Sequence, residues 1–257
     1  MDLMVPMGGG EVWVRDSGGP GVPAVLIHPG WGDSGIWDEV DALLAGRVRT
    51  IRFDSLGYGD SSSPTVRYTA LDELRAVLDR LGVERAVLAG HSGGGGTALS
   101  LAVAEPARVA ELVLLAPGVS GYPWPADDPF VTAMQTAVRH RNIEAMVSLG
   151  LLTWAPAGAG ESVETQIRSA VSGMEQQAPY LDEDPPVYHR LDAITAPATL
   201  VCGELEYPMV VDCCRALAAR IPGCRVRTVP EADHMLPLRV PGLVAELIAQ
   251  AVAGLPG

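Results

Sequence analysis

The chain has 257 residues, of which 48% are apolar and 19% charged, so it can build a sizeable core and is not a disordered polypeptide. Its formal net charge is −13, and all 18 basic residues are arginine. This charge argues against nucleic acid and anionic membrane surfaces as partners, and the absence of lysine excludes Schiff-base chemistry on a lysine side chain.

Short apolar runs predict the strands in the first half of the chain. They lie at residues 3–7, 11–16, 23–28, 47–54, 85–90 and 111–117. The first two are expected to pair across the glycines between them. Helical patterns lie between the later runs, at about 36–45, 69–81 and 93–104. Alternating strands and helices predict an α/β fold, with a mostly parallel sheet covered by helices on both faces.

This alternation is interrupted between about residues 119 and 193 and then resumes. The resumed part has predicted strands at 198–203 and 224–230 and predicted helices at 209–220 and 241–253. The interrupting segment is rich in proline, glycine and acidic residues, with helices expected at about 129–149 and 161–177. We therefore predict a core formed by 1–118 and 194–257, and a helical cap inserted at 119–193 over the carboxyl edge of the sheet.

A glycine-rich stretch around Ser92 is placed between a predicted strand and a predicted helix. Residues 90–94, Gly-His-Ser-Gly-Gly, match G-x-S-x-G in the strand–turn–helix context that gives this motif its meaning. Such a tight turn exposes the serine hydroxyl, and it requires glycine where the flanking chains approach closely. The Gly93 amide at the start of the helix can stabilise an oxyanion. The two glycine motifs that bind phosphate groups, G-x-x-x-x-G-K-[ST] and G-x-G-x-x-G, are both absent from this stretch around Ser92.

A nucleophilic serine needs a base, and His234 is the candidate among the five histidines. It follows the last predicted strand by four residues, in a loop at the edge where α/β sites gather. An acid to orient it is expected after the strand at 198–203: Glu206 is preferred, and Glu204 and Asp233 are the alternatives. We interpret His28 as a hydrogen-bonding residue at the end of a strand.

These segments together resemble the α/β-hydrolase fold, over nearly the whole chain. The order Ser92, Glu206, His234 agrees with the order in that fold. Three further stretches are similar to family segments: HPGWGDSGIW (28–37), DSLGYGDS (54–61) and PEADHMLPLRVP (230–241). The resemblance is to the esterase, lactonase and cofactor-free haloperoxidase-like group with a short cap, and it implies an eight-stranded, mostly parallel sheet.

Two departures from the family pattern affect the site. Pro29 stands where the family usually has glycine after the histidine, and proline has no amide hydrogen, so the second oxyanion donor is Gly30 or Trp31. The acid is glutamate, whereas the family more often has aspartate.

The pocket wall is expected to be aromatic and apolar. Its predicted residues are Trp31, Tyr58, His91, Trp124, Trp154 and Met235.

The resemblance implies a serine hydrolase that cleaves an ester, thioester or lactone of a small, largely apolar acyl substrate. Serine at position 92 argues against dehalogenase and epoxide hydrolase chemistry, which need aspartate there. No metal or organic cofactor is expected. An acyltransferase or thioesterase that acts on an acyl carrier protein is the first alternative, and a non-catalytic binding protein is the second.

The cysteines and the first ten residues indicate the cellular compartment in which the protein is expected. Cys202, Cys213, Cys214 and Cys224 lack both a disulfide framework and the spacing of zinc sites, so reduced thiols in a cytoplasmic protein are expected. An adjacent Cys213–Cys214 redox pair is disfavoured. Residues 1–10 lack the basic and apolar stretches of a signal peptide, and no stretch is suited to span a bilayer.

Overall fold

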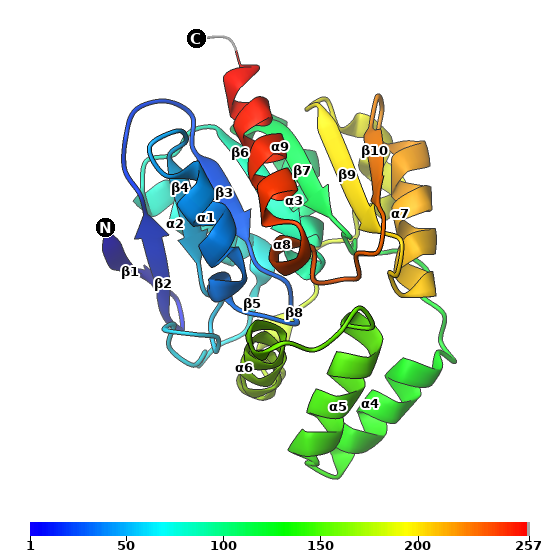
Figure 1. The fold of residues 1–257 in the computed structure, drawn as a ribbon. Coiled ribbons are helices and arrows are strands. Elements are labelled where there is room, and N and C mark those ends of the chain that lie inside the picture. Colours follow the sequence, from blue (N-terminus) through cyan, green and yellow to red (C-terminus); the bar gives the residue numbers. More distant parts are fainter. Residues whose placement is uncertain (256–257) are drawn as a thin grey trace.

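The computed structural model describes residues 1–255. Its central feature is a sheet of eight strands in the order β1-β2-β4-β3-β6-β7-β9-β10 (Figure 1). The strands are β1 (Asp2–Met7), β2 (Gly10–Asp16), β3 (Ala24–Ile27), β4 (Thr50–Phe53), β6 (Ala86–His91), β7 (Val109–Leu115), β9 (Ala198–Gly203) and β10 (Arg225–Val229). The pairs from β4 to β10 are parallel, and β1 and β2 form the antiparallel hairpin predicted from the sequence.

Helices cover both faces of this sheet. They are α1 (Asp38–Leu44), α2 (Ala70–Arg80), α3 (Gly93–Ala104), α7 (Pro208–Arg220), α8 (Leu236–Arg239) and α9 (Pro241–Ala253). The helices α1 and α9 contact each other on one face, whereas α2 and α3 pack together on the other (Figure 1). The central strands β3, β4, β6 and β9 are buried at every position, as expected for strands covered on both sides. The predicted fold class is confirmed.

The segment between β7 and β9 forms a separate group of helices. It contains α4 (Pro129–Arg139), α5 (Ile143–Trp154), α6 (Glu161–Gln177) and the 3-10 helix η3 (Tyr188–Ala193). In Figure 1, α4, α5 and α6 lie together beyond one end of the sheet. Its strand β8 (Leu181–Asp182) pairs with β5 (Tyr68–Thr69), a short parallel pair that the sequence analysis did not predict. We call residues 119–193 the cap, after the predicted insertion.

The single helix predicted at 129–149 is wrong, because the structure has two helices there. Arg141 adopts a left-handed backbone conformation with φ of 51°, which ends the first helix. The Asn142 side chain then accepts a hydrogen bond from the Ala145 amide (3.1 Å) and caps the second. The second helix also continues to Trp154, beyond the predicted end, and this extension carries the tryptophan to the site.

Within the described chain, no helix combines the length and the apolar character needed to cross a membrane. The four cysteines are present as free thiols, three of them buried and Cys224 half-buried.

Candidate active site

Ser92 lies at the sharp turn between β6 and α3. Its backbone has φ of 52° and ψ of −117°, a combination that L-residues rarely adopt and that is typical of strained functional turns. The flanking glycines are required by close contacts. A Cβ on Gly90 would lie 2.4 Å from the Gly94 carbonyl oxygen, and a Cβ on Gly94 would lie 2.4 Å from that of Ile27. Because backbone atoms cause both clashes, no side-chain rearrangement relieves them.

His234 and Glu206 form a buried pair on two neighbouring loops. Glu206 follows β9, and its Oε2 lies 2.8 Å from the Nδ1 of His234. Its Oε1 accepts the Tyr207 amide hydrogen (2.8 Å), which fixes the carboxylate in place. Because the carboxylate can only accept here, Nδ1 carries the hydrogen and the lone pair is on Nε2. No protein group among residues 1–255 hydrogen-bonds to that Nε2, which leaves its lone pair free to accept a proton.

The two alternative acids are engaged elsewhere. Glu204 is exposed, and its carboxylate accepts from the Glu231 amide at 3.2 Å. Asp233 is fully buried and forms an ion pair with Arg239, with Oδ2 2.8 Å from the Arg239 Nη2. Of the three carboxylates weighed from the sequence, Glu206 is therefore the one that contacts His234.

His91, next to Ser92, is wrongly predicted as a pocket residue. It is fully buried, and its Nε2–H donates to the His234 carbonyl oxygen at 2.7 Å. Burial, with a smaller contribution from nearby His234, holds the pKa of His91 well below its ordinary value, so the ring is neutral. His91 thereby brings the His234 loop beside the serine turn. No local pattern in the sequence indicates this role, because the partner carbonyl lies 143 residues away.

His28 is a hydrogen-bonding residue at the end of β3. Its Nδ1–H donates to the Pro29 carbonyl (2.8 Å), and its Nε2 accepts from the Ser55 amide (3.0 Å). Both ring nitrogens are thus engaged with backbone, and the ring anchors the loop that begins at Pro29.

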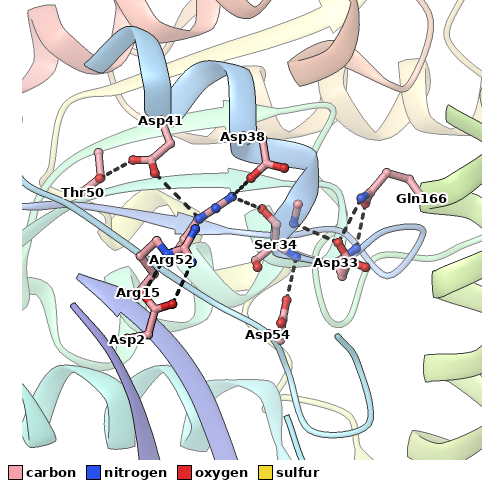
Figure 2. Close-up of polar contacts among 11 residues, drawn as sticks. Asp2, Arg15, Asp33, Ser34, Asp38, Asp41, Thr50, Arg52, Asp54 and Gln166 are labelled. Carbon is pink, nitrogen blue, oxygen red and sulfur yellow. Dashed lines mark hydrogen bonds and ion pairs between the residues drawn. The ribbon is translucent and has the colours of Figure 1, made fainter. Parts of the chain in front are cut away.

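That loop, residues 29–35, is held rigidly from the core and from the cap (Figure 2). On the cap side, Gln166 of α6 accepts from the Asp33 amide and donates to its carboxylate, both at 2.9 Å. On the core side, the Ser34 amide donates to Asp54 (2.8 Å), and its carbonyl accepts from Arg52 (3.0 Å). Rigidity here matters because the loop places the Gly30 amide near the serine turn: a Cβ on neighbouring Gly93 would lie 3.6 Å from the Gly30 nitrogen.

Two further contacts fasten the cap to the loops of the site. The Tyr207 hydroxyl donates to Asp128, the N-cap residue of α4, at 2.9 Å. Asp233 accepts from the Ala157 amide in the loop after α5 (3.0 Å). The cap is therefore tied to the loop after β3, to the loop of Glu206 and to the loop of His234. Sequence reasoning missed these ties, since their partners are between 76 and 133 residues apart.

Trp154, at the end of α5, covers His234. The two ring centroids are 4.6 Å apart with the planes inclined by 42°, and Trp154 is 5% exposed. Its indole also contacts Trp31 and Phe130 edge-on or tilted. The cap thus supplies an apolar cover that keeps the imidazole away from bulk water.

A cavity of about 510 Å³ lies between the serine turn and the cap. Its lining includes Ser92, Gly93 and three predicted tryptophans, Trp31, Trp124 and Trp154. Tyr58 lines a smaller adjoining cavity instead. The placement of Met235 in the pocket wall is wrong: its side chain is fully buried in the core, because the turn after His234 directs it inward.

The wall of this cavity contains acidic side chains on one segment of the cap. Asp182, Glu183 and Asp184 form part of its wall, and the wall of this cavity in the described chain includes no arginine or histidine. Arg67 pairs with Asp182 from outside. No group of three or more His, Cys, Asp or Glu side chains in residues 1–255 is arranged to hold a metal ion.

Comparison with known proteins identifies the family. The sequence matches the profile of the "Alpha/beta hydrolase family" over residues 24–247. The chain belongs to this family. Among curated relatives of this α/β hydrolase is the 2-hydroxy-6-oxononadienedioate/2-hydroxy-6-oxononatrienedioate hydrolase of Paraburkholderia phymatum. It is 28% identical over 88% of this chain and 86% of its own.

Solved structures agree with this membership. Est816, described as an N-acyl homoserine lactone degrading enzyme, superposes with a TM-score of 0.79 at 27% identity, over 96% of this chain and 98% of its own. The esterase RhEst1 from Rhodococcus sp. ECU1013 has the same fold, with a TM-score of 0.83 at 22% identity, over 100% and 99% of the two chains. Together the comparisons support a hydrolase activity of the α/β-hydrolase type for this chain.

Proposed function

We propose that the chain is a serine hydrolase that cleaves an ester, thioester or lactone of a small, largely apolar substrate through an acyl-enzyme on Ser92. The observation that carries the proposal is the buried Glu206–His234 pair beside a strained serine turn. The 2.8 Å contact fixes the tautomer that leaves Nε2 as the base. The tryptophan-lined cavity next to Ser92 suits an apolar substrate.

The first step forms the acyl-enzyme. His234 Nε2 takes the proton from the Ser92 hydroxyl as its oxygen bonds to the substrate carbonyl carbon, and the carbonyl oxygen becomes an oxyanion. The amides of Gly93 and Gly30 donate to that oxyanion. Gly30 is preferred over Trp31 because its nitrogen lies beside Gly93. The imidazolium, stabilised by Glu206, then protonates the leaving group as its bond to carbon breaks.

The second step releases the acid. A water molecule gives a proton to His234 Nε2 while its oxygen attacks the acyl carbon. The imidazolium then returns that proton to Ser92 as the acyl–oxygen bond breaks. Cover by Trp154 strengthens the electrostatic interaction between Glu206 and the imidazolium by lowering the local dielectric constant.

A dianionic substrate fits this cavity poorly. The name of the Paraburkholderia relative specifies a dioate substrate, which carries two carboxylates. Here three acidic residues line the cavity, and its wall within residues 1–255 offers no cationic side chain to pair with a carboxylate. We therefore propose a neutral or cationic substrate rather than a dicarboxylate.

The proposal is tested by replacing Ser92 and measuring both the hydrolysis of an ester and covalent labelling by a serine-directed probe. Ser92→Ala should lower the hydrolysis of p-nitrophenyl esters by on the order of 10³-fold or more. A fluorophosphonate probe should add its mass to the wild-type chain and to the control Ser172→Ala, which changes an exposed serine on α6, but not to Ser92→Ala. Full activity in Ser92→Ala would overturn the proposal.

Two other outcomes would redirect it. Labelling of Ser92 with negligible hydrolysis but rapid transfer to an amine, alcohol or carrier-protein thiol would indicate an acyltransferase. Failure of the probe to label wild type would favour a binding protein on the same scaffold.

A further inference from the structure

A second, smaller cavity of about 120 Å³ opens beside the serine turn. It is bounded by Gly30 and Gly93, the two glycines whose amides are proposed to hold the oxyanion. It shares four lining residues with the larger cavity, Ala70, Gly93, Thr97 and Leu181, so the two cavities adjoin. Its volume corresponds to about four water molecules, or to a substituent of a few heavy atoms.

The polar group that distinguishes this side cavity is Glu73 of α2. Glu73 is fully buried, and its Oε1 accepts from the Leu56 amide at 2.6 Å. Its Oε2 is also buried and has no hydrogen bond of standard geometry in the described chain, although the Ser55 hydroxyl lies close enough to the carboxyl group to lower its pKa. A buried carboxyl oxygen without a partner costs about 1–3 kcal/mol, so this oxygen would gain from a polar group that reaches it through the side cavity.

The carboxyl group of Glu73 is mostly protonated at neutral pH. Burial, reinforced by the nearby Asp184 and Asp72 carboxylates, raises its pKa to about 8. Two tyrosines lie close enough to Glu73 to be affected by it. The pKa values of Tyr58 and Tyr68 are raised by burial and by Glu73 itself. His28 is engaged with backbone at both ring nitrogens, as described above. Within residues 1–255, the lining of the side cavity therefore includes one carboxyl group that is mostly protonated at neutral pH, and no arginine.

The two cavities can receive different ends of a substrate bonded to Ser92, because Ser92 lines the larger cavity and Gly93 lines both. The leaving group must reach His234 to be protonated, and His234 is covered by Trp154, which lines the larger cavity. An acyl chain that extends past Gly30 would enter the side cavity, because Gly30 and Gly93 both line it. The two spaces meet at Gly93, beside the serine that would carry the acyl group.

We propose that the side cavity is an acyl subsite in which Glu73 hydrogen-bonds a small neutral oxygen-bearing group on the acyl chain, such as an ether, hydroxyl or keto oxygen. This inference rests on the proposed function, because it assigns the acyl half of the substrate of Ser92. It narrows that substrate to short acyl chains with a polar neutral atom near the carbonyl. A carboxylate fits this subsite poorly, since the lining in the described chain includes no arginine to pair with it and already contains the Glu73 carboxyl group.

The test compares two p-nitrophenyl esters of the same shape, methoxyacetate and butanoate, which differ by one oxygen in place of a methylene. The measured quantity is the ratio of their kcat/KM values, divided by the ratio of their hydroxide-catalysed rates so that intrinsic reactivity cancels. Wild type should favour methoxyacetate. Glu73→Met should lower the corrected ratio by about 3- to 10-fold, as expected for one neutral hydrogen bond.

A second variant covers the case in which Glu73→Met does not fold. Glu73→Gln keeps an acceptor for the Leu56 amide and a donor for the subsite, but it cannot ionise. The corrected ratio of wild type should fall as pH rises through about 8, because the carboxyl loses the hydrogen it donates, whereas that of Glu73→Gln should stay level. Glu84→Gln, which changes an exposed carboxylate remote from both cavities, should behave as wild type.

A corrected ratio that neither substitution nor pH changes by more than 2-fold would overturn the subsite, and Glu73 would then serve only to hold Leu56. Such a result leaves the proposed function intact, because both esters would still require Ser92. Loss of the requirement for Ser92 would instead refute the proposed function.

Discussion

Replacing Arg239 by methionine tests the tie between the cap and the His234 loop. Arg239 donates to both carboxylate oxygens of Asp233, at 3.0 and 2.8 Å, and also to the Gly158 carbonyl of the cap. Methionine keeps much of the apolar stem but removes the charge. Asp233, which is fully buried, would then keep only the amides of Ala157 and Met235 as donors.

The size of the effect follows from burial. Breaking a fully buried ion pair by removing one partner costs about 3–5 kcal/mol. The Arg239 side chain is 22% exposed and two backbone donors remain on Asp233, so we expect about 2–3 kcal/mol. For a chain of this length that corresponds to a fall in Tm of about 5–10 °C.

The free energy of unfolding is measured by urea denaturation monitored with circular dichroism. Measuring Asp233→Ala and the double variant as well completes a double-mutant cycle, which gives the coupling energy between Arg239 and Asp233. Arg215→Met is the control, because its pair with Asp212 is exposed on both sides and should contribute less than about 1 kcal/mol. The reasoning is refuted if Arg239→Met is no more destabilising than the control, or if the coupling energy in the cycle is below about 0.5 kcal/mol.

Three other substitutions follow from the structure. Burial raises the pKa of Glu73 from 4.5 to about 8, so between these pH values the folded state holds a proton that the unfolded chain releases. The free energy of unfolding of wild type should therefore fall between pH 4.5 and 8, by up to about 1.4 kcal/mol per pH unit from this group. Urea unfolding of Glu73→Gln should lack this part of the pH dependence. Gly173→Ala should destabilise by about 1–3 kcal/mol in the same assay, because its Cβ would lie 2.5 Å from the buried Tyr58 ring; an unchanged midpoint would contradict the contact. Gly90→Ala should prevent native folding or cost more than about 3 kcal/mol, measured by near-ultraviolet circular dichroism, since its Cβ would meet backbone that cannot move aside.

The fold could be predicted because its signals are local. Buried strands such as 86–91 are continuous apolar runs, and the glycines around Ser92 mark a turn that other residues cannot adopt. The pairing of Glu206 with His234 followed from chain order and loop position. Both residues sit at the ends of adjacent strands, so the sheet itself brings them together.

What could not be predicted depends on side-chain direction. His91 and Met235 neighbour Ser92 and His234 in the chain, yet both turn inward, and no periodicity in a short turn indicates that. Glu73 did leave a signal, since it precedes Val77 by four residues and therefore lies on the apolar face of α2. A carboxyl group on the apolar face of a helix indicates either a buried hydrogen bond or a binding site. Glu73 accepts a hydrogen bond from the Leu56 amide and also lines the side cavity.

Three of the ties between cap and core lie close to the proposed reacting groups and limit how this enzyme can be engineered. Asp33, Tyr207 and Asp233 each lie within a few residues of a group proposed to take part in the reaction, and each holds a different part of the cap. A foreign insertion grafted between β7 and β9 would have to bring its own partners for all three. Substrate range is therefore better altered by changing residues inside the existing cavity than by exchanging the insertion as a module.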